Sequence, residues 1–130
     1  MNTTIRCALG LLLALGLAAT APAQVARKFT ATTLRGVITF GDFPQITLNG
    51  TAVRLSPGAR VRNPANLIVN PVTLTGSQVL AHYTLDLGGT QVRDVWILTP
   101  QEAAVKPWPV TAEQAASWTF DAVHQTWTTP

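Results

Sequence analysis

The chain has 130 residues, of which 47% are hydrophobic and 12% are charged, and its formal net charge is +3. This length provides for one domain with one hydrophobic core and argues against a second domain. With only one cysteine, Cys7, the chain cannot form an internal disulfide, so its stability must come from packing and hydrogen bonds.

The N-terminus has the pattern of a secretory signal peptide. Arg6 precedes a twelve-residue apolar run from Ala8 to Ala19, and Ala21-Pro22-Ala23 supplies the small side chains that signal peptidase reads. The run is shorter than the roughly 20 residues that span a bilayer. We therefore expect cleavage before Gln24 and a periplasmic or secreted product without a membrane span.

Removal of the signal would leave a cysteine-free chain with an uneven distribution of charge. Cys7 precedes the apolar run, so it is not a lipid attachment site, and it would leave with the signal. From residue 27 to 62 six basic residues face one acid, whereas from residue 86 to 121 two basic residues face five acids. One half of the mature chain is thus cationic and the other mildly anionic.

Short runs of threonine and aliphatic residues between Phe29 and Thr99 predict strands separated by turns. Residues 35–40 form the first expected strand, and residues 41–44 form a turn. Asn49-Gly50 then predicts a type I′ hairpin turn. Counting outward from that turn opposes Leu48 to Thr51, Ile46 to Val53 and Gln45 to Arg54.

A second reversal is expected at the loop Pro57-Gly58-Ala59. This odd-length loop opposes Leu55 to Val61 and Arg54 to Arg62, which keeps the apolar residues on one face. The alternation directs five side chains into a single interior: Ile46, Leu48, Val53, Leu55 and Val61.

The remaining barrel segments are an irregular connection and a second hairpin. Asn63-Pro64 and Asn70-Pro71 bracket the apolar residues 67–69, which we interpret as a packed connection because proline interrupts regular structure. Residues 80–87 and 91–98 then predict two strands joined by a Gly88-Gly89 turn.

The C-terminal residues predict short helices and a terminal hairpin. Thr99, Pro100 and Glu102 have the spacing of a capping box, and Thr111 offers a second capped helix start. Aromatic and β-branched residues in the segment 118–129 favour a hairpin that turns near residues 121–124.

Three strands in a meander, the pattern Leu74-x-Gly76-x-x-Val79 and a closing hairpin indicate a mainly β protein with a small five- to six-stranded antiparallel barrel. Residues 35–99 resemble OB-like and SH3-like barrels, and the whole chain is similar to small exported proteobacterial proteins of unknown function. The expected organisation is a signal peptide (1–23), an N-terminal arm (24–34), the barrel (35–99) and a C-terminal capping segment (100–130).

The expected register places a candidate anion-binding site on the outer face of the barrel. Gln45, Arg54 and Arg62 would lie in a row across three strands with Arg60 nearby, and like charges directly opposed are unfavourable without an anion between them. OB-type barrels bind oligomers on such a face. Nucleic acid is not favoured, because no aromatic residues interleave with the arginines. The alternative is a solvated face with the arginines spread apart.

Candidate catalytic groups have no recognisable spacing, so we expect no catalytic site, metal or cofactor. The spacing of Asp121 and His124 would suit a helix face, but a turn is predicted there. His82, within a strand, is expected to be a surface or hydrogen-bonded residue. The full set of groups is His82, His124, Ser56, Ser77, Ser117, Asp86, Asp94 and Asp121.

Trp108, Trp118 and Trp127 lie in the last 23 residues, where they could contact a sugar or a partner protein, or else pack against the barrel. Together these patterns favour a non-catalytic binding or scaffold module of the cell envelope that contacts an envelope protein or an anionic polymer. An anion- or oligosaccharide-binding barrel, an enzyme whose site forms only in three dimensions, and self-assembly through a strand edge remain the alternatives.

Overall fold

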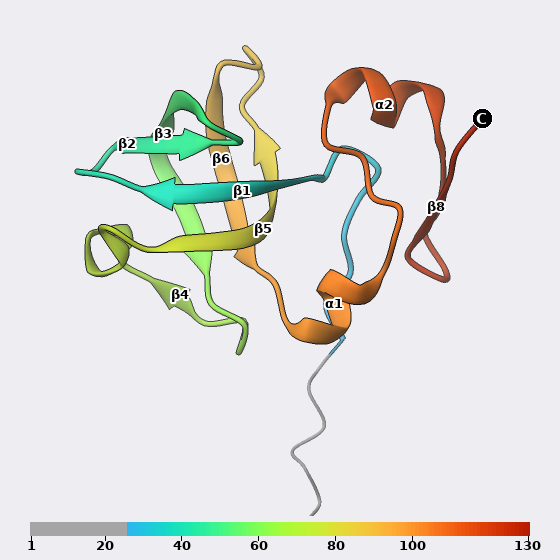
Figure 1. Ribbon diagram of the computed structural model, residues 1–130, viewed down its shortest axis with the longest axis horizontal. Helices are drawn as coiled ribbons and strands as arrows, with labels where there is room; N and C mark the ends of the chain where they lie inside the picture. Colours follow the sequence, from blue (N-terminus) through green and yellow to red (C-terminus); the bar gives the residue numbers. More distant parts are fainter. Residues whose placement is uncertain (1–25) are drawn as a thin grey trace, which may run out of the picture.

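A computed structural model describes residues 26–130 as a small β-barrel with a C-terminal segment along one side (Figure 1). The predicted signal peptide, residues 1–23, lies outside the described residues. Within residues 26–130, none of the helices combines the length and the apolar character needed to cross a membrane.

Five strands close the barrel, and a sixth short strand extends it beside β3. The hydrogen-bonded order around the barrel is β1, β2, β3, β6 and β5, with β5 returning to β1. The strands are β1 (Leu34–Phe40), β2 (Gln45–Leu48), β3 (Thr51–Arg62), β4 (Ile68–Val69), β5 (Gln78–Leu85) and β6 (Gln91–Ile97). The predicted small β-barrel is confirmed.

The strand order distinguishes the two barrel types that the sequence left open. β3 pairs with β6, and this pair is parallel, whereas the other pairs are antiparallel. A continuous meander of the SH3-like kind would instead place β3 next to the following barrel strand, β5. The order is therefore that of an OB-like Greek-key barrel, with one parallel pair that the sequence analysis did not predict.

The hairpin formed by β2 and β3 has the predicted register. Gln45 opposes Arg54, and Ile46 opposes Val53. At the turn, Asn49 has φ of 51° and Gly50 has φ of 85°, as a type I′ turn requires. The predicted hairpin is confirmed.

The predicted reversal at residues 57–59 is wrong, because β3 continues through them as one strand from Thr51 to Arg62. Pairing with β6 shifts register between Leu55 and Arg60, and Gly58 has φ of 76°, so the Pro-Gly pair bends the strand without turning it back. Arg54 and Arg62 consequently lie along one strand instead of opposing each other.

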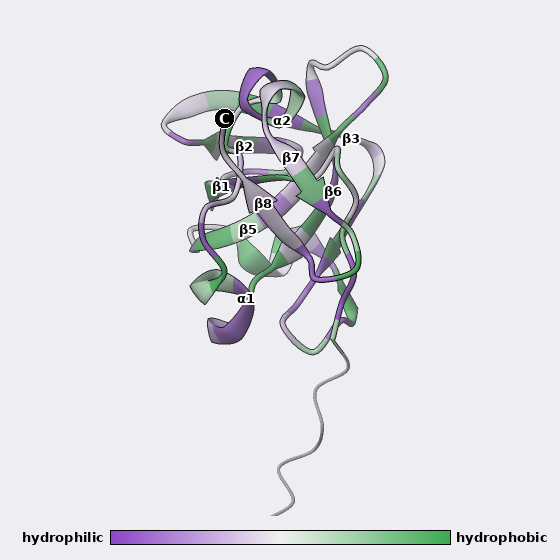
Figure 2. Cartoon of the chain, turned by 90° about the vertical axis from the view of Figure 1, so that its right-hand side faces the viewer, coloured by the Kyte–Doolittle hydropathy of each residue, from purple (hydrophilic) through white to green (hydrophobic). Residues whose placement is uncertain are grey.

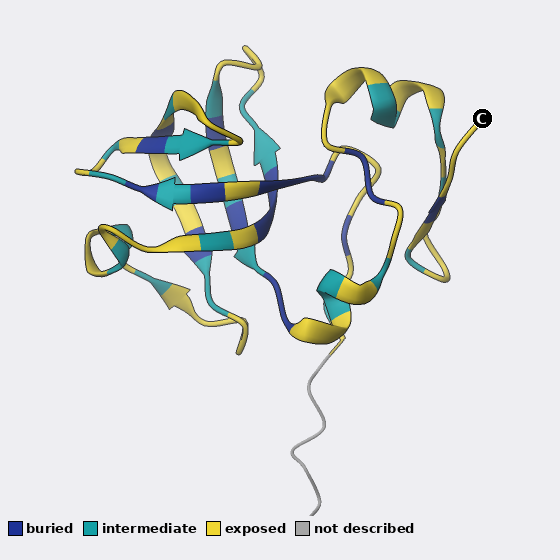
Figure 3. Ribbon diagram, viewed as in Figure 1, coloured by how far each residue is buried: buried dark blue, intermediate teal, exposed yellow. Residues whose placement is uncertain are grey.

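The barrel interior is an apolar cluster. Figure 3 shows buried residues along the strands of the barrel. Five of its side chains have no solvent exposure: Ile38, Val61, Ala81, Val92 and Val95 are each 0% exposed. The five residues predicted to share one interior all belong to this core or pack against it. Their prediction is confirmed, because a bend that absorbs a register shift keeps Leu55 and Val61 on the same side of β3.

The connection between β3 and β5 is more exposed than predicted. β4 pairs with the end of β3, and the 3-10 helix η1 (Pro71–Leu74) follows. Leu67 and Ile68 are 63% and 66% exposed, so the expectation of a packed connection is wrong. β4 has only two residues and pairs only with β3. Side chains in and beside this short strand therefore have few neighbours and remain in contact with solvent.

Two short helices and a hairpin form the C-terminal segment, which lies along one side of the barrel (Figure 2). The predicted capping box at Thr99 and the capped start at Thr111 are confirmed, since both side chains accept hydrogen bonds from the backbone. The predicted terminal hairpin is also confirmed. The elements are α1 (Pro100–Ala104), α2 (Ala112–Ser117), β7 (Thr119–Asp121) and β8 (Thr126–Thr128).

Candidate functional site

A second core joins the C-terminal segment and the N-terminal arm to the outside of the barrel. Phe29, Trp108 and Trp127 are its buried residues, and Trp96 of β6 and Trp118 pack against them. The indole of Trp108 donates to the carbonyl of Thr33 at 2.9 Å. Trp108 and Trp127 are 6% and 5% exposed, so they pack and do not offer the contact surface that was one sequence hypothesis.

His82 lies in this second core and has a structural role. Its ring stacks on Trp108 with centroids 4.2 Å apart, and its Nε2 accepts a hydrogen bond from Nε of Arg35 at 3.2 Å. Burial, and then the charges of Arg35 and Arg27, lower the pKa of His82 from 6.5 to about 3. His82 is therefore neutral at ordinary pH and fully enclosed, which does not suit a general base.

The buried arginines are bound within the protein. Arg35 donates to the carbonyls of Glu102, Ala103 and Val105 at the C-terminal end of α1. Arg27 pairs with the carboxylate of Glu102 and donates to the carbonyl of Ile97. Burial raises the pKa of Glu102, but its bonds to Arg27 and Thr99 outweigh this, so the pKa of Glu102 is lowered overall. These groups hold the barrel, the arm and α1 together.

The other candidate catalytic groups do not converge within the described residues. Asp121 contacts His124 at 2.6 Å in the exposed β7–β8 turn, where it also accepts backbone hydrogen bonds as predicted. Asp94 accepts from Thr84 at 3.1 Å. Asp86 accepts from backbone N–H groups of its own turn. Residues 26–130 contain no group of three or more potential metal-ligating His, Cys, Asp or Glu side chains.

The predicted arginine row is formed only in part. Gln45 and Arg54 are cross-strand neighbours, as expected. Arg62 instead lies opposite Trp96, with its guanidinium carbon 5.6 Å from the ring centroid, and pairs with Asp94 at 3.6 Å. Arg60 lies opposite Asp94. Asp94 is thus a neighbour of both Arg60 and Arg62. Arg54, by contrast, has glutamines and no acid as its cross-strand neighbours.

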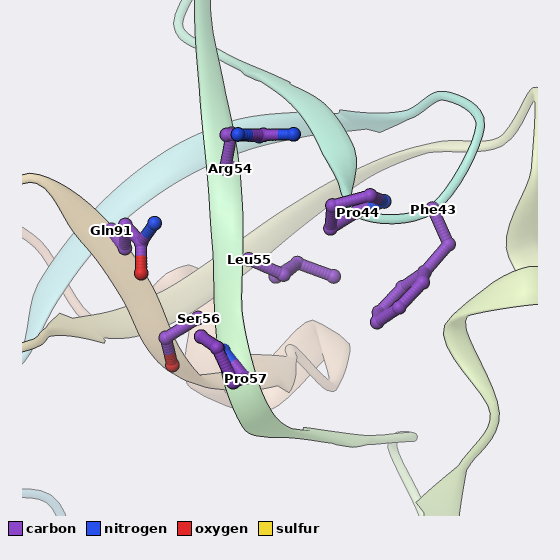
Figure 4. Close-up of a pocket in the computed structure, with 7 residues that line it drawn as sticks. All are labelled: Phe43, Pro44, Arg54, Leu55, Ser56, Pro57 and Gln91. Carbon is purple, nitrogen blue, oxygen red and sulfur yellow. The ribbon is translucent and has the colours of Figure 1, made fainter.

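Arg54 borders a groove of about 310 Å³ at the bend of β3 (Figure 4). Phe43 and Pro44 of the β1–β2 loop lie on one side of β3, and Gln91 of β6 lies on the other. The loop is fixed to the strand because the N–H of Leu55 donates to the carbonyl of Pro44 at 2.9 Å. The groove is lined by Phe43, Pro44, Arg54, Leu55, Ser56, Pro57 and Gln91.

Polar groups at this groove lack partners within the described part of the chain. The side chains of Arg54, Ser56 and Gln91 make no hydrogen bond or ion pair there, and neither does Gln45 next to Arg54. The buried arginines, by contrast, have several acceptors each. The groove thus combines free hydrogen-bonding groups and one positive charge with an aromatic ring, since Phe43 is 52% exposed.

Sequence reasoning found Gln45 and Arg54, named Ser56 only as a candidate catalytic group, and missed Phe43 and Gln91. Phe43 stood in a predicted turn, and Gln91 stood at the start of a strand whose neighbour was unknown. Only the parallel pairing of β3 with β6 brings Gln91 opposite Arg54. The one signal in the sequence that could have pointed to the groove was a phenylalanine next to a proline in a predicted turn.

Comparison of the chain with protein-family models, with curated proteins and with solved structures gives no match. The groove therefore has to be interpreted from its own chemistry.

Proposed function

We propose that the protein is an exported, non-catalytic binding module of the cell envelope that holds an anionic ligand in the groove beside Arg54. The observation that supports this most directly is the set of unpartnered polar side chains around an exposed aromatic ring. Groups left free in this way cost little to engage, because no internal hydrogen bond has to be broken first. The predicted signal peptide supports an envelope location.

The composition of the groove supports binding in preference to catalysis. Among the described residues, its lining contains no histidine, aspartate or glutamate next to Ser56. A serine without a neighbouring base is a weak nucleophile. Both histidines lie outside the groove: His82 is enclosed in the second core, and His124 lies in the exposed β7–β8 turn.

Arg54→Ala tests the proposal. The side chain is exposed and makes no ion pair within the described residues, so the variant should keep the unfolding temperature of the wild type. It should elute from a heparin column at clearly lower salt, since one charge at the ligand site is lost.

Arg93→Ala is the control for net charge. Arg93 has 66% exposure, lies outside the groove and pairs with Asp94 at 3.7 Å. This variant removes the same charge and should shift elution less than Arg54→Ala. Equal elution of both variants would mean that retention reflects net charge alone, and the proposed site would be rejected.

A further inference from the structure

We propose that the ligand of the groove is a carboxylated sugar unit of an acidic polysaccharide, with its ring on Phe43 and its carboxylate on Arg54. This inference rests on the proposed function and names the ligand class of the same site.

The size and the surface of the groove suit a ring. Ligand pockets typically measure roughly 300–1,000 Å³, so the volume of about 310 Å³ corresponds to a small occupant. Phe43, Pro44 and Pro57 supply flat apolar surfaces. The C–H face of a pyranose is apolar and can pack on an aromatic ring, whereas its edge carries hydroxyls that need partners. Amide and hydroxyl groups for that edge are present in Gln91 and Ser56.

The charge of the groove suits one carboxylate and not a dense row of phosphates. Among residues 26–130, Arg54 is the single cation in its lining. The carboxylate of Asp86 lies close by, since it accepts a hydrogen bond from the N–H of Gln91 at 3.2 Å. A polyphosphate or a nucleic-acid strand would bring several charges towards that carboxylate. Nucleic acid would also need successive aromatic platforms, and the described residues give the groove one aromatic ring.

An extended peptide fits the groove less well. Peptides that add to a strand depend on free backbone donors at the strand. In the groove wall, Pro44 and Pro57 have no N–H, and the N–H of Leu55 is already bonded to Pro44. Fewer backbone donors are therefore available than at an open strand edge, which favours recognition by side chains and suits a ligand with hydroxyl and carboxylate groups.

The test is calorimetric titration of the protein, expressed from its full-length sequence, with three probes: trigalacturonate, its methyl ester and inorganic polyphosphate. Trigalacturonate should bind, and the ester, which keeps the rings and loses the charge, should bind at least about tenfold more weakly. Arg54→Gln and Phe43→Ala should each weaken trigalacturonate binding by about tenfold or more. Arg93→Gln and Leu87→Ala are the controls, since Leu87 is an exposed apolar loop residue outside the lining.

The outcomes separate this inference from the proposed function. Binding of polyphosphate that depends on Arg54 but not on Phe43, without binding of trigalacturonate, would overturn the sugar inference and keep the anion site. If none of the probes responds to Arg54→Gln, both fail. Equal affinity for trigalacturonate and its ester would also overturn the inference, because the carboxylate would then have no role.

Discussion

Two residues of the same type, Arg35 and Arg54, illustrate how position decides the role of a side chain. Arg35 is 7% exposed, and its guanidinium donates hydrogen bonds to His82 and to backbone carbonyls at the end of α1. Burial lowers the pKa of Arg35, although the nearby charge of Glu102 opposes this. Arg54 is exposed and has no partner within residues 26–130. The first arginine stabilises the fold, and the second is free to bind.

His82 gives the protein a predictable loss of stability in acid. The pKa of His82 is 6.5 when the side chain is free and about 3 in the fold. Between these values the unfolded chain binds a proton that the folded chain does not, so the free energy of unfolding falls as the pH falls from 6.5 towards 3. The slope from this group is at most about 1.4 kcal/mol per pH unit.

Urea denaturation of the wild type and of His82→Gln at pH 7 and pH 4.5 measures this contribution. Glutamine can still accept a hydrogen bond from Arg35, but it does not titrate. The free energy of unfolding should therefore differ less between pH 7 and pH 4.5 in the variant than in the wild type. An unchanged difference would show that other groups, such as Glu102, cause the acid sensitivity.

At the scale of elements, β3 shows what the sequence could and could not predict. Alternation identified the residues of the interior correctly, because both a tight loop and a bend preserve the face of Leu55 and Val61. It could not tell a reversal from a bend, since the deciding contact is the parallel pairing with β6, whose paired residues lie 34 to 37 positions further along the chain. The local signals at Asn49-Gly50 and Thr99 were sufficient because their hydrogen bonds are local.

The bend itself is testable at Gly58. Its φ of 76° is a conformation in which an L side chain is strained, although nothing lies within 4 Å of an added Cβ. Gly58→Ala should therefore lower the free energy of unfolding by about 1 kcal/mol through backbone strain alone. Gly88→Ala is the control, because that glycine lacks a positive φ and an added Cβ would meet only ordinary contacts from 3.7 Å. Equal stability of the two variants in urea denaturation would contradict the strained bend.

At the scale of the whole molecule, residues 26–130 form two apolar cores that share the wall formed by β1, β5 and β6. The barrel core lies inside the wall, and the second core lies on its outer side beneath the C-terminal segment. Composition suggested one core, and the tryptophans suggested that the tail covers the barrel. The contribution of the N-terminal arm was not foreseen, because Arg27 and Phe29 show no pattern until their partners on α1 and β5 are known.

We expect Phe29 to stabilise the C-terminal segment against local unfolding and to have little effect on the stability of the barrel. Its ring contacts His82 and Trp108 at centroid distances of 4.3 and 5.9 Å, and it is 7% exposed. Truncation of such a buried ring costs roughly 3–5 kcal/mol, a loss that falls on the second core. In Phe29→Ala, amide hydrogens of α1, α2, β7 and β8 should exchange with solvent faster, while those of β1, β5 and β6 stay protected.

Phe43→Ala makes the same deletion at an exposed site and should leave exchange unchanged outside its own loop. If Phe29→Ala instead lowers protection equally in barrel and C-terminal segment, the two cores unfold as one cooperative unit and the arm supports the entire protein.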